Sequence, residues 1–145
     1  MSLLDGSTEL ISIKLYYKYA NTKVGKRLVI LEEDKAIELL KDEKKAKEVE
    51  ILETGWSMIT WKEQNEIMEL SYKKTNPQTM EKQFDFISYR DAIVKRCLKT
   101  WDISVNNQIV PVTSEAIDQL PGIVVINIYQ KFEEFLDYSE EELKN

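Results

Sequence analysis

Histidine is absent from all 145 residues. The side chains that remain as candidates for catalysis are carboxylates, one thiol and basic groups. Glu63 and Glu66 stand three residues apart, so they would share one face of a helix. Two carboxylates can act as general acid and general base, but that chemistry needs a pocket that shifts their pKa values. Capping and solvation of a helix surface explain both residues more simply, and we adopt that interpretation.

Cys97 is the only cysteine, so the chain cannot form an internal disulfide bond. Arg96 beside it would lower the pKa of an exposed thiol, but Cys97 falls on an apolar stripe, where cysteine is usually buried and inert. Without histidine there is no Ser–His or Cys–His nucleophile pair and no His-ligated zinc. The four glycines lie too far apart for a phosphate-binding loop. We therefore predict no enzymatic activity, no metal and no cofactor.

Basic side chains on one predicted helix form the candidate surface for an acidic partner. They are Arg90, Lys95, Arg96 and Lys99. Nucleic acid is the other class of partner, but single-strand binding needs a broader positive groove with stacking rings. The chain has a net charge of −6, and residues 101–145 carry nine acidic and two basic side chains. We therefore expect no contact with nucleic acid, and ordinary solvation of the helix remains the simpler alternative.

The chain contains three tryptophans, a large number for a small domain. Most such residues belong to a core, whereas a partly exposed tryptophan is typical of a protein-binding surface. Together with neighbouring apolar residues and the basic face, they give a set of candidate partner-binding residues. The set is Trp61, Met68, Tyr72, Arg90, Lys95, Arg96, Lys99 and Trp101.

Helices must position these residues, and the second half of the chain contains the signals for them. Thr60 and Glu63 match a capping box, which predicts a helix from there to about residue 74, where Asn76-Pro77 would end it. Trp61, Met68 and Tyr72 recur along one stripe of this helix. A second helix is predicted over residues 84–100. After a turn at Asn106-Asn107, Thr113 or Ser114 caps a short helix, and Pro121 suits the start of a final helix.

The first half of the chain has a different pattern. Residues 10–19 alternate between apolar and polar, residues 21–26 are polar with a glycine, and residues 27–31 are apolar, which together predict a β-hairpin. A charged helix follows over about residues 33–49. Residues 50–57 fit either a short strand or an extended linker, and Gly55 is the predicted boundary between two parts.

We therefore predict an α+β fold that is predominantly α-helical. An N-terminal β-hairpin with a helix (residues 1–55) precedes a part with three to four helices (56–138) and an acidic tail (139–145). The length fits one domain, and the composition of 43% hydrophobic and 32% charged residues fits an ordered chain. No apolar run approaches the ~18 residues of a membrane span, and the N-terminus has no signal-peptide pattern, so we expect a cytosolic protein.

Three segments of the second half carry a family resemblance. They are Trp61-Lys62-Glu63-Gln64-Asn65-Glu66-Ile67, Cys97-Leu98-Lys99-Thr100-Trp101-Asp102, and Val110-Pro111-Val112-Thr113-Ser114-Glu115-Ala116-Ile117-Asp118-Gln119-Leu120-Pro121. With the helix that contains Tyr89 and Arg90, they resemble the tail assembly chaperones of tailed bacteriophages over about residues 55–136. Residues 10–49 lie outside this resemblance.

The resemblance implies a non-enzymatic morphogenesis protein that binds tape-measure and tail-tube proteins in the host cytoplasm, with a homo-oligomer as a further possible state and no membrane contact. Apolar helix faces suit this role because they can cover the apolar face of a helical client. One alternative is a permanent virion subunit of the tail, baseplate or connector. Another is a small acidic phage inhibitor of a host enzyme, although acidic and basic residues mix through residue 100.

Overall fold

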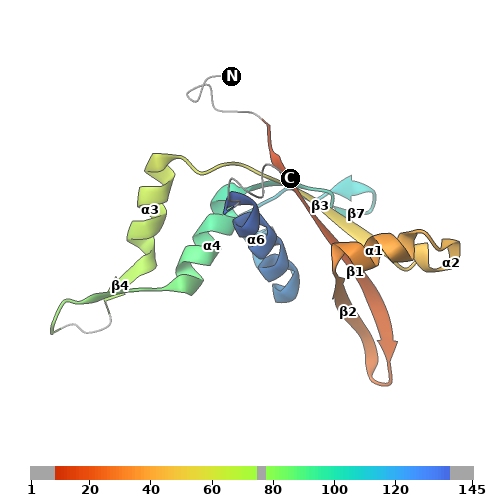
Figure 1. Cartoon of the computed structure of the whole chain (residues 1–145). Helices are drawn as coiled ribbons and strands as arrows, with labels where there is room; N and C mark the ends of the chain where they lie inside the picture. The colour runs from red at the N-terminus through yellow and green to blue at the C-terminus, as the bar shows by residue number, and fades with distance from the viewer. Residues whose placement is uncertain (1–8, 75–77, 138–145) are drawn as a thin grey trace.

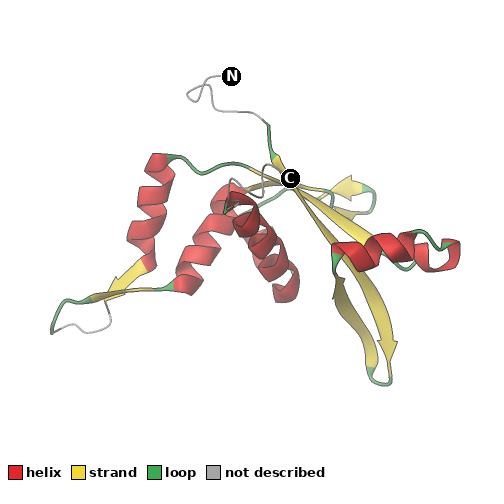
Figure 2. Ribbon diagram, viewed as in Figure 1, coloured by secondary structure: helices red, strands yellow, loops and turns green. Residues whose placement is uncertain are grey.

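The computed structural model describes residues 9–74 and 78–137, and its centre is a four-stranded antiparallel sheet (Figures 1 and 2). In spatial order the strands are β2 (Gly25–Leu31), β1 (Ile11–Thr22), β3 (Glu50–Trp56) and β6 (Leu98–Trp101). The predicted hairpin of residues 10–31 is confirmed as β1 and β2, which pair from Tyr16 with Leu31 to Thr22 with Gly25. Gly25 has a φ of 136°, a conformation that favours glycine.

One face of the sheet holds the main core, which α6 (Gly122–Leu136) covers. Ile13 and Leu15 point to this face because alternate strand residues share a side. The rings of Trp56 and Phe132 stack with centroids 4.6 Å apart. Both side chains are fully buried, so this stack joins the sheet to α6.

The polar groups inside this core have partners. The Trp56 indole N–H donates to Thr54 Oγ1 at 2.7 Å, and the Thr54 hydroxyl donates to the backbone carbonyl of Ile13 at 2.7 Å. A buried polar group without a hydrogen bond is costly. This chain of hydrogen bonds therefore allows Thr54 to sit at 4% exposure in the middle of the sheet.

A second, smaller apolar cluster lies on the other face of the sheet. Tyr16 and Leu31 of the hairpin pack there against Ala36 of α1 (Glu33–Leu40). The predicted single helix over residues 33–49 is two helices, because the Asp42 side chain accepts a hydrogen bond from the Lys44 N–H and so starts α2 (Glu43–Ala46). A side chain of this kind competes with helical pairing of the backbone.

A helical hairpin with a small β-ribbon lies beside the core. It consists of α3 (Trp61–Ser71), β4 (Tyr72–Lys74), β5 (Lys82–Phe84) and α4 (Phe86–Cys97). The predicted helix over residues 60–74 ends earlier, at Ser71, where the chain enters β4. The predicted stop at Asn76-Pro77 lies outside the described residues.

The remaining elements follow the predicted signals. A short hairpin of β7 (Ser104–Val105) and β8 (Gln108–Ile109) turns at Asn106-Asn107, whose φ angles of 53° and 64° suit a tight turn. Thr113 caps α5 (Ser114–Asp118) by accepting from the Ala116 N–H. Pro121 directly precedes α6, as predicted.

The prediction of a predominantly α-helical fold is wrong. The described residues are 44% helical and 31% strand, with a four-stranded sheet. Residues 98–100 of the predicted second helix belong to β6. Cys97 and Trp101 have the spacing of a helical stripe, but pairing with β3 takes Leu98–Trp101 into the sheet, and this long-range pairing has no local signal.

The predicted boundary at Gly55 falls inside β3. The neighbour of β3 in the sheet is β6, which comes from the other side of that boundary. A Cβ at residue 55 would collide with Thr100 Oγ1 and stand 2.9 Å from Leu10 Cδ1. Gly55 therefore permits the close approach of β3 to its neighbours, and the two predicted parts share one sheet and one core. The predicted acidic tail, residues 139–145, lies outside the described residues.

Candidate protein-interaction surface

Helix α3 begins with the predicted capping box, which is confirmed. The Thr60 hydroxyl accepts from the Glu63 N–H at 3.2 Å, and a Glu63 carboxylate oxygen accepts from the Thr60 N–H at 3.2 Å. Arg96 of α4 forms ion pairs with α3. Its guanidinium lies 2.8 Å from Glu66 Oε2 and 3.7 Å from Glu63 Oε2. Glu63 and Glu66 are thus both engaged in holding α3 against α4.

Only one narrow side of α3 is buried, and it contains Ile67 and Ser71. Trp61 and Met68 of the predicted stripe lie about a quarter-turn or more around α3 from Ile67, given 3.6 residues per turn, whereas Tyr72 is the first residue of β4. We call Trp61, Met68 and Tyr72 the α3 ridge. Trp61 is 76% exposed, Tyr72 is 43% exposed, and Met68 is partly exposed. An indole ring this open to solvent is what a protein-binding residue would present.

The ridge continues into the β-ribbon through contacts between rings. Tyr72 and Phe84 pair across β4 and β5 with ring centroids 5.5 Å apart, and Phe84 lies 5.4 Å from the ring of Tyr89. Phe84 remains 44% exposed. The apolar surface therefore extends from α3 to the start of α4.

Two further apolar residues at the start of α4 are exposed and were not among the predicted site residues. Phe86 is 51% exposed and Ile87 is 68% exposed. The Arg90 guanidinium lies 5.6 Å from the centre of the Phe86 ring, a cation–π contact. An aspartate directly before an apolar residue is an N-cap signal, and reading Asp85 in this way would have placed both residues in the exposed first turn.

Asp85 fixes the junction between the ribbon and α4. Its carboxylate accepts from the Ile87 and Ser88 N–H groups and lies 3.0 Å from Lys73 Nζ. The hydrogen bond from Lys73, followed by those from Ser88, lowers the pKa of Asp85 from its usual 3.8 to about 2. The junction therefore carries a charged carboxylate at neutral pH, and this anchor holds Phe84 and Phe86 on either side of it.

The four predicted basic residues occupy different environments. Lys95 lies 2.9 Å from Asp118 of α5 and 3.2 Å from Asp91, and the hydrogen bond with Asp118 raises its pKa. Arg96 links α4 to α3, as described above. Lys99 is exposed on β6. The structure thus does not gather the four residues into one free basic face, because Lys95 and Arg96 hold neighbouring helices.

Trp101 and Cys97 are inside the core. Trp101 is 6% exposed, and its indole N–H donates to the Val110 carbonyl at 2.6 Å. Its ring is therefore inaccessible to a partner in this conformation. Cys97 is 1% exposed, and burial raises the pKa of its thiol to about 11. The prediction of a buried Cys97 is confirmed, and a thiol with this pKa is uncharged at neutral pH.

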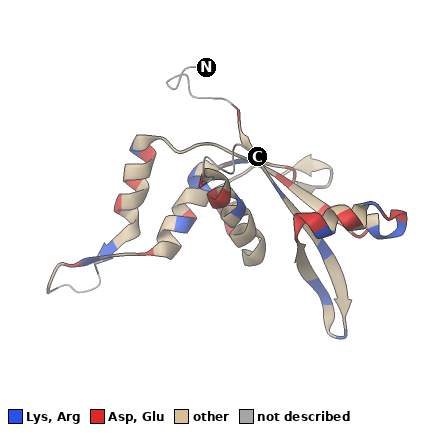
Figure 3. Cartoon of the chain, viewed as in Figure 1, with Lys and Arg blue, Asp and Glu red and all other residues tan. Residues whose placement is uncertain are grey.

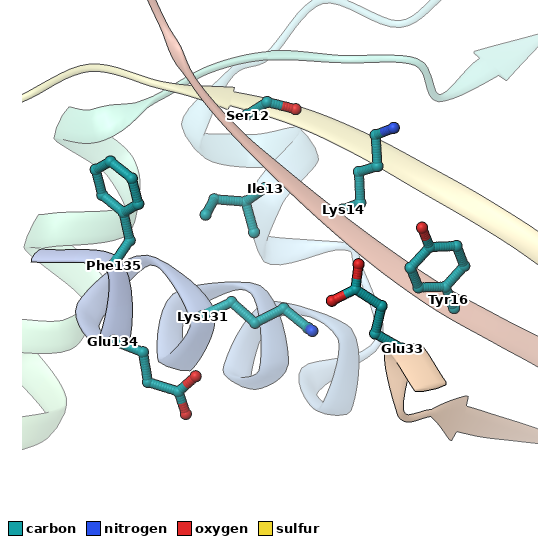
Figure 4. A pocket seen from close by; sticks show the side chains of 8 residues that line it. All are labelled: Ser12, Ile13, Lys14, Tyr16, Glu33, Lys131, Glu134 and Phe135. Atoms are coloured by element: carbon teal, nitrogen blue, oxygen red, sulfur yellow. The ribbon is translucent and has the colours of Figure 1, made fainter. Parts of the chain in front are cut away.

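Among the described residues, no group of three or more Cys, Asp or Glu side chains has the arrangement needed to hold a metal ion. A groove of about 330 Å³ lies between β1, the start of α1 and the end of α6 (Figure 4). Its walls carry charged groups of both signs, namely Lys14, Glu33, Lys131 and Glu134. We call it the β1–α6 groove.

Comparison of the chain with known protein families, curated proteins and solved structures found no match. In residues 9–74 and 78–137, no helix is both long enough and apolar enough to cross a membrane.

Proposed function

We propose that this protein is a non-enzymatic morphogenesis protein of a tailed bacteriophage that binds another tail polypeptide through the α3 ridge. The observation that supports the proposal is the exposure of Trp61 on α3, whose other side is anchored by Arg96, and of Tyr72 directly after that helix. Large rings on a fixed helix suit binding to an apolar helix face, because little conformational entropy is lost on association. The resemblance of residues 55–136 to tail assembly chaperones supplies the biological context.

The binding partner in this proposal is the tape-measure protein, with the tail-tube protein as the second client. The ridge presents a line of apolar side chains that continues to Phe84. A helical client with apolar residues at intervals of three and four would place them along this line. The function takes place in the host cytoplasm while tails are assembled.

Co-expression with the tape-measure and tail-tube proteins of the same phage tests the proposal. We expect the tagged chain to capture a tape-measure fragment, and we expect Trp61→Ser to weaken that binding about 30-fold, the equivalent of about 2 kcal/mol for a central tryptophan. Lys62→Ser, the next residue on α3, is the matched control and should leave the affinity within about twofold. Failure of the wild-type chain to bind either tail protein would contradict the proposal.

Mass spectrometry of purified phage particles separates an assembly chaperone from a permanent subunit. A chaperone leaves the particle after assembly, so we expect its peptides to be absent from purified virions. Recovery of the chain in amounts comparable to a tail-tube protein would instead identify it as a subunit of the tail, baseplate or connector.

A further inference from the structure

The β1–β2 hairpin carries only basic charge, although the chain as a whole is acidic. Residues 10–31 contain five basic side chains and no acidic one, so the rest of the chain carries −11 if the whole carries −6. The five are Lys14, Lys18, Lys23, Lys26 and Arg27. The expectation of no contact with nucleic acid rests on the net charge of the chain and on residues 101–145, and neither describes this hairpin.

Most of these basic groups are available to a partner. Lys14 lies 3.4 Å from Glu53 Oε1 of the neighbouring strand. The other four basic side chains of the hairpin form no ion pair with any residue of 9–74 or 78–137. Three of them, Lys23, Lys26 and Arg27, are exposed beside the turn. The turn end therefore presents three cations to solvent.

The turn end of the hairpin projects beyond the four-stranded sheet. Pairing of β1 with β3 ends at Tyr17, so from Lys18 onward the two strands pair only with each other. Thr22 is five residues beyond Tyr17, about 17 Å along an extended strand. Figure 3 shows basic residues alone on the hairpin, and its turn stands apart from the acidic start of α1.

The turn is stabilised by hydrogen bonds of its own. The Thr22 hydroxyl donates to the Gly25 carbonyl at 2.6 Å and accepts from the Val24 N–H at 3.3 Å. Val24 is 98% exposed at the end of the turn. The neighbouring cations are therefore carried by a preformed scaffold, which reduces the entropy lost on binding.

The dimensions of the projecting ribbon match the major groove of B-form DNA. That groove is about 12 Å wide and about 8.5 Å deep. A ribbon with side chains on both faces is about 10 Å thick, the spacing of stacked sheets, and the projecting part is about 17 Å long. The turn can thus reach the base edges while the sheet stays outside. The minor groove, about 6 Å wide, is too narrow for it.

The cations are placed to meet both walls of such a groove. Lys26 pairs with Asn21 and Arg27 pairs with Ala20. Neighbouring strand residues point to opposite faces, so Lys26 and Arg27 project from opposite faces of the ribbon, and Lys23 lies at the turn. When the ribbon enters the groove turn first, each face meets one phosphate backbone.

We propose that the turn end of the β1–β2 hairpin binds the major groove of double-stranded DNA. Lys23, Lys26 and Arg27 contact phosphates, and Val24 lies against the base edges. Binding is mainly independent of sequence, because phosphate contacts carry no sequence information. The acidic remainder of the chain stays outside the groove, where salt weakens its repulsion over ~8–10 Å. An acidic polypeptide is less favoured, because it would match the charge of the hairpin but not its shape.

Fluorescence anisotropy of the full chain with a labelled DNA duplex of about 20 base pairs tests this contact. We expect saturable binding at about 50 mM NaCl and about 40-fold weaker binding at about 200 mM, the loss for three phosphate contacts. Lys23→Glu with Lys26→Glu and Arg27→Glu should abolish binding at both salt concentrations. An unchanged circular dichroism spectrum shows that this variant is folded.

A matched variant separates the hairpin from the net charge of the chain. Lys44→Glu with Lys45→Glu and Lys47→Glu makes the same change in net charge at α2, away from the hairpin. Its affinity for the duplex should stay within about threefold of the wild-type value, because salt screens distant charges.

Other probes test the shape of the ligand. An RNA duplex of the same sequence should bind at least about fivefold more weakly, because the major groove of an A-form helix is too narrow for a ribbon. Methyl green, which occupies the major groove of DNA, should compete with the chain, whereas netropsin, which occupies the minor groove, should not.

Absence of saturable DNA binding at low salt would overturn the inference, as would equal losses in the hairpin variant and the α2 variant. Binding of polyglutamate or of duplex RNA as tight as that of DNA would also overturn it, and would point to an acidic polypeptide or to RNA as the partner. This contact uses no residue of the α3 ridge, so its failure leaves the proposed binding of tail proteins to be judged by its own experiment.

Discussion

Trp56 and Trp61 stand five residues apart, yet Trp56 is 0% exposed and Trp61 is 76% exposed. Trp56 ends a central strand, stacks on Phe132 and donates to Thr54. Trp61 is the first residue of α3, and Arg96 binds the opposite side of this helix. The same residue type therefore stabilises the fold in one region and forms a candidate binding surface in the other. Four substitutions test this contrast, in order of decreasing expected effect on stability.

The largest loss of stability is expected where the core is broken directly. Trp56→Ala removes a buried ring from the centre of the sheet and leaves the Thr54 hydroxyl without its donor. We expect the free energy of unfolding to fall by about 3–5 kcal/mol, measured by urea denaturation. A loss no larger than that of Trp61→Ala would show that the two regions do not differ as described.

The second-largest loss of stability is expected at the close contact between β3 and β6. In Gly55→Ala the new Cβ collides with Thr100 Oγ1, and we expect a loss of about 1–3 kcal/mol, typical of overpacking. Thr100→Ala removes that oxygen, so the double variant should lose less stability than the sum of the two single variants. Strict additivity of the two losses in urea denaturation would exclude the collision as the cause.

The junction that carries the exposed rings should weaken at low pH. The pKa of Asp85 is lowered to about 2 in the folded protein, so its charge stabilises the fold above the usual pKa of 3.8, and this stabilisation is lost as the pH falls through about 2. The decrease in melting temperature caused by Asp85→Ala should therefore be constant at neutral pH and narrow between about pH 4 and 2. Lys73→Met removes the ion pair alone and should reduce this pH dependence; an equal decrease at every pH would contradict the assignment.

The smallest effect on stability is expected at the α3 ridge. Trp61→Ala alters a mostly solvated side chain, so the free energy of unfolding should change by less than about 0.5 kcal/mol, while binding of a tape-measure fragment should weaken. Urea denaturation and fluorescence anisotropy with a labelled fragment measure the two quantities separately. A loss of stability of several kcal/mol would show that Trp61 supports the fold instead.

Part of the candidate surface could be found without the structure. The spacing of Trp61, Met68 and Tyr72 predicts one helical stripe, because a helix repeats every 3.6 residues, but only Trp61 and Met68 lie on α3, which ends at Ser71. The same spacing does not tell which side of α3 faces the core. That side holds Ile67 and Ser71, because Arg96 and α4 approach α3 there. Trp101 shows the same limit, since pairing of β6 with β3 carries it into the core.

The β1–β2 hairpin shows that the net charge of a sequence segment does not reveal how its charges are arranged in the fold. Residues 1–50 have equal numbers of acidic and basic side chains, so their net charge alone suggested no charged surface. In the fold, the basic residues of this segment lie on the β1–β2 hairpin, whereas acidic residues lie in the first turn of α1. Their separation in space depends on where β2 ends, and averaging over the sequence hides it.

Local sequence signals were sufficient to predict where several helices begin and where one hairpin turns. Thr60 with Glu63, Thr113, Pro121 and Asn106-Asn107 each act through the backbone within three or four residues, so their signals are local and readable. Three other features could be found only in the folded chain: β3 and β6 are neighbours, one side of α3 is buried, and Lys95 and Arg96 join helices. Those outcomes depend on contacts between residues that are far apart in the chain, and the free energy of such contacts exists only once the chain has folded.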